Sequence, residues 1–465
     1  MLTYLLNIAF AIAATVLYIK APWTYSYDYC VLLMSLFIAQ NVLFFATNKR
    51  IHWLGFEFFF ALSFFLVNFV YPVFYAPTER IYWSLFSLPF NDDYVTRCTA
   101  LAYFGYAWYM LGATRILQLK REEPTEPTFT ISMRQYIWFF GITIIAWLLY
   151  IVTGGLAALQ SVYAEGASLR DVGIYSYFNN IFTIGCYLMA IFIFRLPKQK
   201  WWFYLLVIGT FILLLLSTGS RQLAVGLGLI LICGFSMYAY HLKWWHVALA
   251  VAGGSVVLFY VMTLRTVGLD FGAWRELLVH TRLIEFWDLY SDLVVNDVNL
   301  FALFGFAQHH DLTWFQGMAL DISSPVPGLA GYIISHSNVP AQMLHGGDLP
   351  SYILLGPEAQ WGCGTNMIGE AYRSFGAVGT AIAMFLIGVW VKESYYRAKT
   401  SVYWYLMYFL LVGHALIYPR APLLFDPRLV TWSLLLLLIV MTITTHQTEI
   451  VNWLNALWKR KEETA

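Results

Sequence analysis

The stretch ILLLLSTGSRQLAVGLGLILI, residues 212–232, places one arginine between two runs of apolar residues. Each run is apolar enough to lie in lipid, whereas the guanidinium of Arg221 keeps its charge at physiological pH. Because a charged side chain is costly inside hydrocarbon, Arg221 is expected at a surface where one membrane-spanning helix ends and the next begins. There it faces outward and is available to bind an anion.

The whole chain has the composition of a membrane protein. Of its 465 residues, 60% are hydrophobic, 19% are aromatic and only 11% are charged. Soluble domains carry roughly 25% charged residues, so we predict an all-α protein that crosses the membrane many times. The formal net charge of +1 gives no reason to expect a nucleic-acid partner. The first apolar run starts at Met1 without a basic leader or a cleavage site, which indicates a retained span.

Apolar runs long enough to cross ~30 Å of hydrocarbon recur along the chain and predict about twelve transmembrane helices. The predicted spans are residues 2–18, 29–46, 53–76, 94–117, 135–153, 176–195, 201–217, 222–240, 244–263, 366–391, 402–418 and 429–446. We therefore divide the chain into an N-terminal bundle (1–263), a large periplasmic loop (264–365) and C-terminal spans (366–465). Lysine and arginine gather in alternate loops and in the C-terminal WKRKEETA, which predicts that both termini are cytoplasmic.

The predicted outer face carries mainly arginines. Apart from Lys20, its cations are Arg80, Arg97, Arg170, Arg221, Arg265, Arg275, Arg282, Arg373, Arg420 and Arg428. Arginine is suited to phosphate because its planar guanidinium forms two parallel hydrogen bonds and stays charged. For Arg80, Arg97 and Arg170 we favour ion pairs or contacts with lipid headgroups. An anion-binding role is assigned to four arginines at span ends, Arg221, Arg265, Arg420 and Arg428.

The predicted periplasmic loop has two parts. In its first part, LIEFWDLYSDLVVNDVNLFALF (283–304), acids and amides recur at spacings of three and four. They are Glu285, Asp288, Asp292, Asn296 and Asn299. This period predicts an amphipathic helix at the outer surface, with a plain solvated face as the equal alternative. The second part is rich in Trp, His and Asp, which suits sugar recognition as well as an ordinary structured lid.

Two further segments carry charges at the ends of apolar helices. In NMIGEAYRSFGAVG (366–379), Glu370 and Arg373 are three residues apart and can pair on one helix face. Such a pair either faces a water-filled cavity or sets the angle at which the span enters the membrane. In YPRAPLLFDPRLV (418–430), prolines restrict the backbone, so that Arg420 and Arg428 can point into one cavity.

Five motifs, in this order, resemble the oligosaccharide repeat-unit polymerases of bacterial envelopes, which include the O-antigen and enterobacterial common antigen polymerases. The motifs are the TGSR of Thr218–Arg221, Leu264–Arg265, Thr281–Arg282 with Trp287–Asp288, the GEAYRSFG of residues 369–376, and the PR…DPR of residues 419–428. The resemblance covers roughly residues 210–430, and the N-terminal half agrees in hydropathy.

The resemblance implies a C-type membrane glycosyltransferase of the bacterial inner membrane that needs no cofactor and no metal. Its donor is a glycan on undecaprenyl pyrophosphate, and its acceptor is one lipid-linked repeat unit at the periplasmic face. The product is a surface polysaccharide, such as the O-antigen of lipopolysaccharide or a capsule. Candidate partners, besides membrane lipid, are the chain-length regulator and the flippase of the same pathway.

The expected chemistry assigns a role to each candidate residue. Negative charge builds on the pyrophosphate as it leaves, and arginines fixed in a poorly hydrated site can stabilise it. Arg221 and Arg265 are the first candidates, Arg420 and Arg428 share that duty, and Arg282 and Arg373 follow. The candidates for the base that accepts the hydroxyl proton are Asp288 and Glu370, followed by His309 and His345. Trp287 and Trp361 are candidates for sugar contacts.

The sequence is also compatible with other functions. A flippase for the same lipid would also need an arginine-lined path, although the chain lacks the internal repeats that are typical of transporters. An O-antigen ligase would use the same donor but transfer the glycan to a lipid A core. His309 and His310 lie next to each other without a recognisable zinc spacing, so no metal site is predicted.

Overall fold

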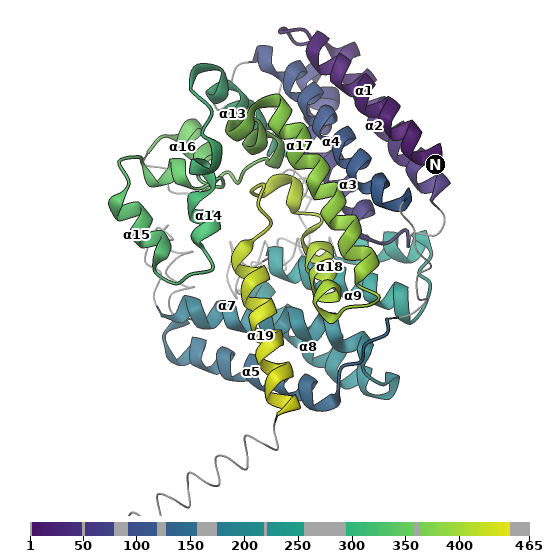
Figure 1. The fold of residues 1–465 in the computed structure, drawn as a ribbon, viewed down its shortest axis with the longest axis vertical. Coiled ribbons are helices and arrows are strands. Elements are labelled where there is room, and N and C mark those ends of the chain that lie inside the picture. Colours follow the sequence, from purple (N-terminus) through teal and green to yellow (C-terminus); the bar gives the residue numbers. More distant parts are fainter. Residues whose placement is uncertain are drawn as a thin grey trace, which may run out of the picture.

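The computed structural model describes residues 2–48, 52–78, 92–118, 127–155, 174–217, 221–254, 294–357 and 362–446. Within these ranges the protein consists of helices joined by turns and loops and contains no β-strand (Figure 1). This confirms the predicted all-α class. Helices are expected in lipid, because only they satisfy the backbone N–H and C=O groups within a single segment.

Six helices in the described ranges are long and apolar enough to cross a membrane. They are α1 (Leu2–Lys20), α2 (Tyr27–Thr47), α5 (Met133–Val152), α7 (Tyr175–Phe192, continued to Arg195), α17 (Met367–Arg397) and α19 (Pro427–Thr445). Three shorter apolar helices are α3 (Phe56–Asn68), α9 (Arg221–Tyr238) and α18 (Val402–His414). The protein is therefore a multi-pass membrane protein, while the total of twelve spans and the three-part division stay predictions.

Most predicted spans coincide with a helix. Besides the helices above, the matching helices are α4 (Val95–Gln118), α8 (Trp201–Ser217) and the helical residues 244–254. The predicted span 53–76 differs, because α3 ends at Asn68 and a π-helical turn, Tyr71–Tyr75, follows. Pro72 lies in that turn and has no N–H to donate, which explains why a regular α-helix does not continue.

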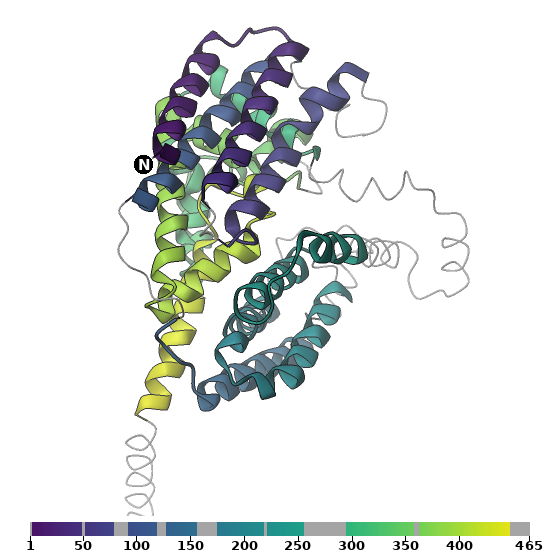
Figure 2. The ribbon, with the colours of Figure 1, turned by 90° about the vertical axis from the view of Figure 1, so that its right-hand side faces the viewer.

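The helices form two packed groups (Figure 2). In the first group α4 packs against α1, α2 and α17, and α17 also contacts α13 (Asp297–His309). The second group contains α5, α7, α8 and α9. The two groups are joined by α18, which contacts α17 and α9, and by α19, which contacts α7 and α5.

Glycines bring α4 and α17 into backbone contact. A Cβ atom at Gly112 would collide with the carbonyl of Phe385, and one at Gly388 would collide with the carbonyl of Tyr109. Small residues at such positions let membrane helices approach closely. Gly376 has a different purpose, because its φ of 68° breaks α17 into a short first segment and a long second one.

Asn366 fixes the start of α17. Its side-chain oxygen accepts hydrogen bonds from the backbone N–H groups of Ile368 (3.0 Å) and Gly369 (3.2 Å), which an N-cap residue is expected to satisfy. Its Nδ2 donates to Oδ1 of Asn68 at 2.9 Å, at the end of α3. This buried amide pair places the first turns of α17, with Glu370 and Arg373, against the core of the first helix group.

The described end of the predicted amphipathic helix is buried. Asn299 Nδ2 donates to Oδ1 of Asn296 and to the carbonyl of Cys363, both at 2.9 Å, and both asparagines are buried. The spacing of polar residues is as predicted, but these two members of the stripe face the interior. The reason is that α13 packs between α4, α17 and α16 (Leu349–Leu355).

Of the three arginines expected to have a structural role, Arg97 is described. Its Nη1 donates to the carbonyl of Ala21 at 2.9 Å, and its guanidinium lies 4.0 Å from the ring centroid of Trp23. Arg97 of α4 thus contacts the residues that follow α1, and these two interactions explain its position without an anionic ligand. Arg80 and Arg170 lie outside the described residues.

A buried ion pair joins α3 to the second segment of α17. Nζ of Lys392 contacts Oε1 of Glu57, and the two side chains are 0% and 4% exposed. We expect Lys392→Met to lower the free energy of unfolding by about 3–5 kcal/mol, because Glu57 would be left charged and unpaired. The double variant Glu57→Gln/Lys392→Met should recover most of this loss, since it leaves no buried charge.

Thermal unfolding in detergent measures both effects. The matched control is the surface pair of Arg397 and Glu393, where Arg397→Met should cost about 0.5 kcal/mol or less. Equal losses for the Lys392 single variant and the double variant would contradict the assigned ion pair.

Candidate functional site

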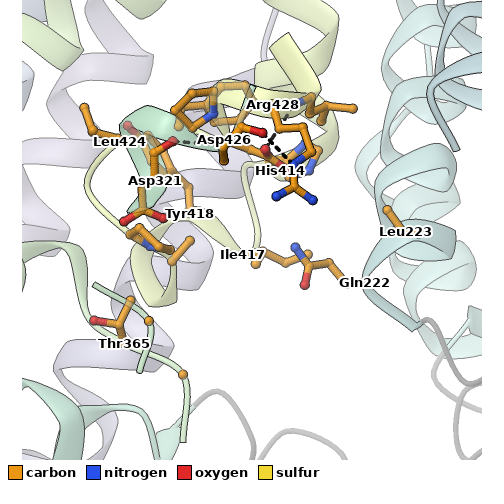
Figure 3. A pocket seen from close by; sticks show the side chains of 18 of the residues that line it. Gln222, Leu223, Asp321, Thr365, His414, Ile417, Tyr418, Leu424, Asp426 and Arg428 are labelled. Atoms are coloured by element: carbon orange, nitrogen blue, oxygen red, sulfur yellow. Dashed lines mark hydrogen bonds between the residues drawn. The ribbon is translucent and has the colours of Figure 1, made fainter. Parts of the chain in front are cut away.

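A cavity of about 440 Å³ lies between the two helix groups. Its walls come from α7, α9, α14 (Ala319–Ser323), the segments before α16 and α17, and the connection from α18 to α19. Arg428, Asp426 and His414 lie together on one side, and Gln222 and Leu223 of α9 lie across the open space (Figure 3). This volume is typical of small-molecule sites, which measure roughly 300–1,000 Å³.

The connection between α18 and α19 is held in shape by its own hydrogen bonds. Tyr418 Oη donates to the carbonyl of Leu423 at 3.0 Å, and Oδ1 of Asp426 accepts the N–H of Leu429 at 3.0 Å to cap α19. Pro427, the first residue of α19, is compatible with a helix start because its missing N–H would have no partner there. The structure brings Arg420 and Arg428, at the two ends of this segment, to the same cavity.

Two side chains of α19 bond the start of this helix to the turn after α14. Arg428 Nε donates to the carbonyl of Ser324 at 3.1 Å, and Trp432 Nε1 donates to the carbonyl of Pro325 at 2.8 Å. Because Arg428 uses Nε for this hydrogen bond and is exposed, its two terminal guanidinium nitrogens can donate to a ligand.

His345 adds a third cation to the cavity. Its Nε2 lies 3.1 Å from Oδ1 of Asp321, and its Nδ1 lies 3.2 Å from Oδ2 of Asp348. Burial alone lowers the pKa of the imidazole, but the two carboxylates outweigh it and raise the pKa of His345 to about 10. The ring is therefore protonated at neutral pH. Both ring nitrogens face carboxylates, so His345 adds positive charge to the cavity without a free N–H, and a protonated ring does not suit the role of base for which it was a candidate.

Arg420, Arg428 and His345 are referred to below as the cation wall. Two helix N-termini adjoin the same space, because Gln222 of α9 and Pro427 of α19 line the cavity. Backbone N–H groups at such ends favour a negative charge. The arrangement is suited to binding an anion such as a phosphate group.

Glu370 lies behind the cavity wall and is fully buried. Its Oε2 accepts the N–H of Leu423 at 2.7 Å, between the two arginines of the α18–α19 connection. A Cβ atom at Gly346 would collide with its carboxyl group, so this carboxyl also packs against the residue next to His345. Glu370 thus joins both segments that carry the cation wall, although it does not line the cavity.

The spacing of Glu370 and Arg373 allows them to pair on one helix face, but no hydrogen bond joins them, although their charges attract each other. Among the described residues, the three guanidinium nitrogens of the buried Arg373 have no hydrogen-bond partner. The guanidinium lies directly against Gly317, where a Cβ atom would collide with Nη2. The spacing allowed the pair, but the carboxylate of Glu370 is held by Leu423 instead. Arg373 does not line the cavity either.

The remaining candidates are placed as follows. His309, at the end of α13, is exposed and is not part of the cavity lining. Arg221 begins α9 directly before Gln222 and Leu223, which do line it. Five candidates, Arg265, Arg282, Trp287, Asp288 and Trp361, lie outside the described residues.

Several cavity residues were missed by the sequence analysis. Asp321 and His414 lie far apart in the chain, and no local pattern connects them to His345. A usable signal was the pair Asn179 and Asn180 within the apolar α7, because amides in a membrane helix face the interior or a water-filled space. In the part of the chain that the structure describes, no group of three or more His, Cys, Asp or Glu could hold a metal ion.

The protonated state of His345 makes the stability of the protein depend on pH. An unfolded histidine has a pKa of about 6.5, so the stabilisation from His345 is complete below that pH and is lost as the pH rises towards 10. We expect the difference in unfolding temperature between wild type and His345→Gln to be largest near pH 6 and to vanish near pH 10. Asp348→Asn should move this loss to lower pH, whereas a difference that is constant with pH would contradict the assignment.

Part of the chain that lines this cavity matches a known protein family. Residues 334–448, about a quarter of the chain, match the family model of the O-antigen polysaccharide polymerase Wzy. No curated protein and no solved structure matches the chain. The matched segment includes His345, the start of α17 and the whole connection from Tyr418 to Asp426. The predicted resemblance of this chain to the O-antigen polymerases is thus confirmed, on the segment that carries the cation wall.

Proposed function

We propose that this chain polymerises lipid-linked oligosaccharide repeat units, acting as a membrane glycosyltransferase. The observation that supports this most is the cation wall, in which two arginines and a protonated histidine reach one cavity within the segment that matches the polymerase family. Such a wall suits a lipid diphosphate better than a neutral ligand, because its three groups are positively charged and its guanidinium groups only donate hydrogen bonds.

The proposed reaction is one glycosyl transfer. A hydroxyl oxygen of the acceptor repeat unit forms a bond to C1 of the sugar that carries the growing glycan. The bond from C1 to the phosphate oxygen breaks, and undecaprenyl pyrophosphate leaves with the electron pair. The hydroxyl proton passes to a carboxylate. The cation wall lowers the barrier by stabilising the charge that develops on the leaving oxygen.

Residues beyond the cation wall are assigned to the same reaction. Arg221 starts α9 beside the cavity, and we assign it, with Arg265 and Arg282, to the same diphosphate. Asp288 stays the proposed base, because Glu370 is fully buried behind the wall. We also propose that Trp287 and Trp361 contact sugars, and that the cavity faces the periplasmic side of the bacterial inner membrane, with both termini in the cytoplasm.

The test is polymerisation by the purified protein in detergent. Undecaprenyl-pyrophosphate-linked repeat units should be converted into a ladder of glycan lengths, with release of undecaprenyl pyrophosphate. Unchanged single units would overturn the proposal and favour a flippase. Transfer only onto a lipid A core would favour an O-antigen ligase.

Arg428→Ala is expected to reduce the turnover number about 100-fold, because it removes a donor to the leaving group. Arg428→Lys keeps the charge but loses the planar fork, so a loss of about 10-fold is expected. Trp432→Phe is the matched control, since it removes the neighbouring bond to Pro325 and leaves every cation in place. Equal losses for Trp432→Phe and Arg428→Ala would mean that Arg428 only anchors α19.

Glu370 separates a structural role from a chemical one. Glu370→Gln keeps an oxygen that can accept the N–H of Leu423, so we expect its turnover number to stay within about threefold of wild type. Glu370→Ala leaves this buried N–H without a partner and should reduce the turnover number at least tenfold. Rates measured on the same repeat units decide between the two roles, because an inactive but folded Glu370→Gln would identify Glu370 as the base.

A further inference from the structure

The cavity has a second polar wall in addition to the cation wall. It is formed by Asn179, Asn180 and Thr183 of α7 together with Gln222 of α9, and we call it the amide wall. We infer that the amide wall binds hydroxyl or acetamido groups of the sugar that is bonded to the diphosphate, and so selects the repeat unit. This inference rests on the proposed function.

The amide wall is polar where the sequence around it is apolar. α7 is one of the candidate membrane spans, and from Phe182 to Phe192 every one of its residues is buried. Asn179 and Asn180 are half-buried, one turn before Thr183. Within the described ranges, the side chains of Asn179, Asn180 and Gln222 form no hydrogen bond with the protein. Their donors and acceptors are therefore available to a ligand in the cavity.

The two walls differ in the chemistry that they can recognise. A carboxamide has both a donor and an acceptor, which matches a sugar hydroxyl, because a hydroxyl also donates and accepts. The guanidinium groups of the cation wall only donate hydrogen bonds, which matches phosphate oxygens. Since C1 of the donor sugar is bonded to the diphosphate, a diphosphate on the cation wall places this sugar next to it. The amide wall is the neighbouring polar surface of the same cavity.

The position of the walls in the chain supports a division of labour. The cation wall lies within residues 334–448, which match the polymerase family, whereas the residues of the amide wall lie outside that segment. The diphosphate is the same for every repeat unit, but the sugar attached to it is not. The segment that matches the family would thus bind the diphosphate, which is constant, and α7 and α9 would bind the sugar, which varies between repeat units.

The experiment compares two lipids that differ only in the sugar. Full-length protein in detergent is titrated with undecaprenyl pyrophosphate and with lipid-linked repeat units from cells in which this chain is inactivated. The variants are Asn179→Ala/Asn180→Ala and Gln222→Ala, and the matched control is Asn338→Ala, an exposed amide that does not line the cavity. Binding of the sugar-free lipid also reports whether each variant is folded.

We expect the double variant to bind the lipid-linked repeat unit about 30-fold more weakly, from the loss of about two hydrogen bonds. Gln222→Ala should weaken it about fivefold. Binding of undecaprenyl pyrophosphate should be unchanged in both variants, and Asn338→Ala should equal wild type. Equal affinity of wild type and both variants for the repeat unit, or equal losses for both lipids, would overturn the inference. If wild type itself bound neither lipid, the proposed function would fail instead.

Discussion

The hydrogen bond from the N–H of Leu423 to Oε2 of Glu370 holds together the parts of the chain that form the cavity. It joins the first turn of α17 to the connection between α18 and α19, 53 residues further on. Because the same carboxyl packs against Gly346, it also positions the segment of His345. This first turn is itself fixed to α3 by the amide pair of Asn366 and Asn68. The cations therefore lie on short segments that are held from behind by buried polar contacts, as preorganised binding requires.

The charges around the cavity are nearly balanced. Its described lining contains three cations, counting the protonated His345, together with the carboxylates of Asp321 and Asp426, and the carboxylate of Asp348, which contacts His345, balances the remaining charge. Both carboxylates have a structural partner, since Asp321 contacts His345 and Asp426 caps α19. Fixed pairs of this kind keep the cations in place, but they reduce the attraction for a diphosphate. The role proposed for Arg221, at the start of α9, would supply a further cation.

The sequence predicted local features well and tertiary contacts poorly. Helix positions followed from apolar length, and prolines at both ends of residues 418–430 correctly indicated a fixed segment that brings two arginines to one cavity. The partner of Glu370 was not predictable, because i,i+3 spacing favours Arg373 and says nothing of a backbone N–H in another segment. The polar stripe around Asn299 shows a related limit. A helical period identifies a polar face but does not tell whether that face meets water or buried amides.

The location of the cavity between two helix groups explains why the whole site could not be predicted from the sequence. The amide wall belongs to α7 and α9 of the second group, whereas the cation wall lies on α19 and on two connecting segments, so neither a local pattern nor a single family match describes the whole site. Substitutions in α7 and α9 can alter the amide wall without touching Glu370, Leu423 or the segments that they join. Under the proposed function, such substitutions would change which sugar is accepted, while the groups assigned to the leaving diphosphate would keep their geometry.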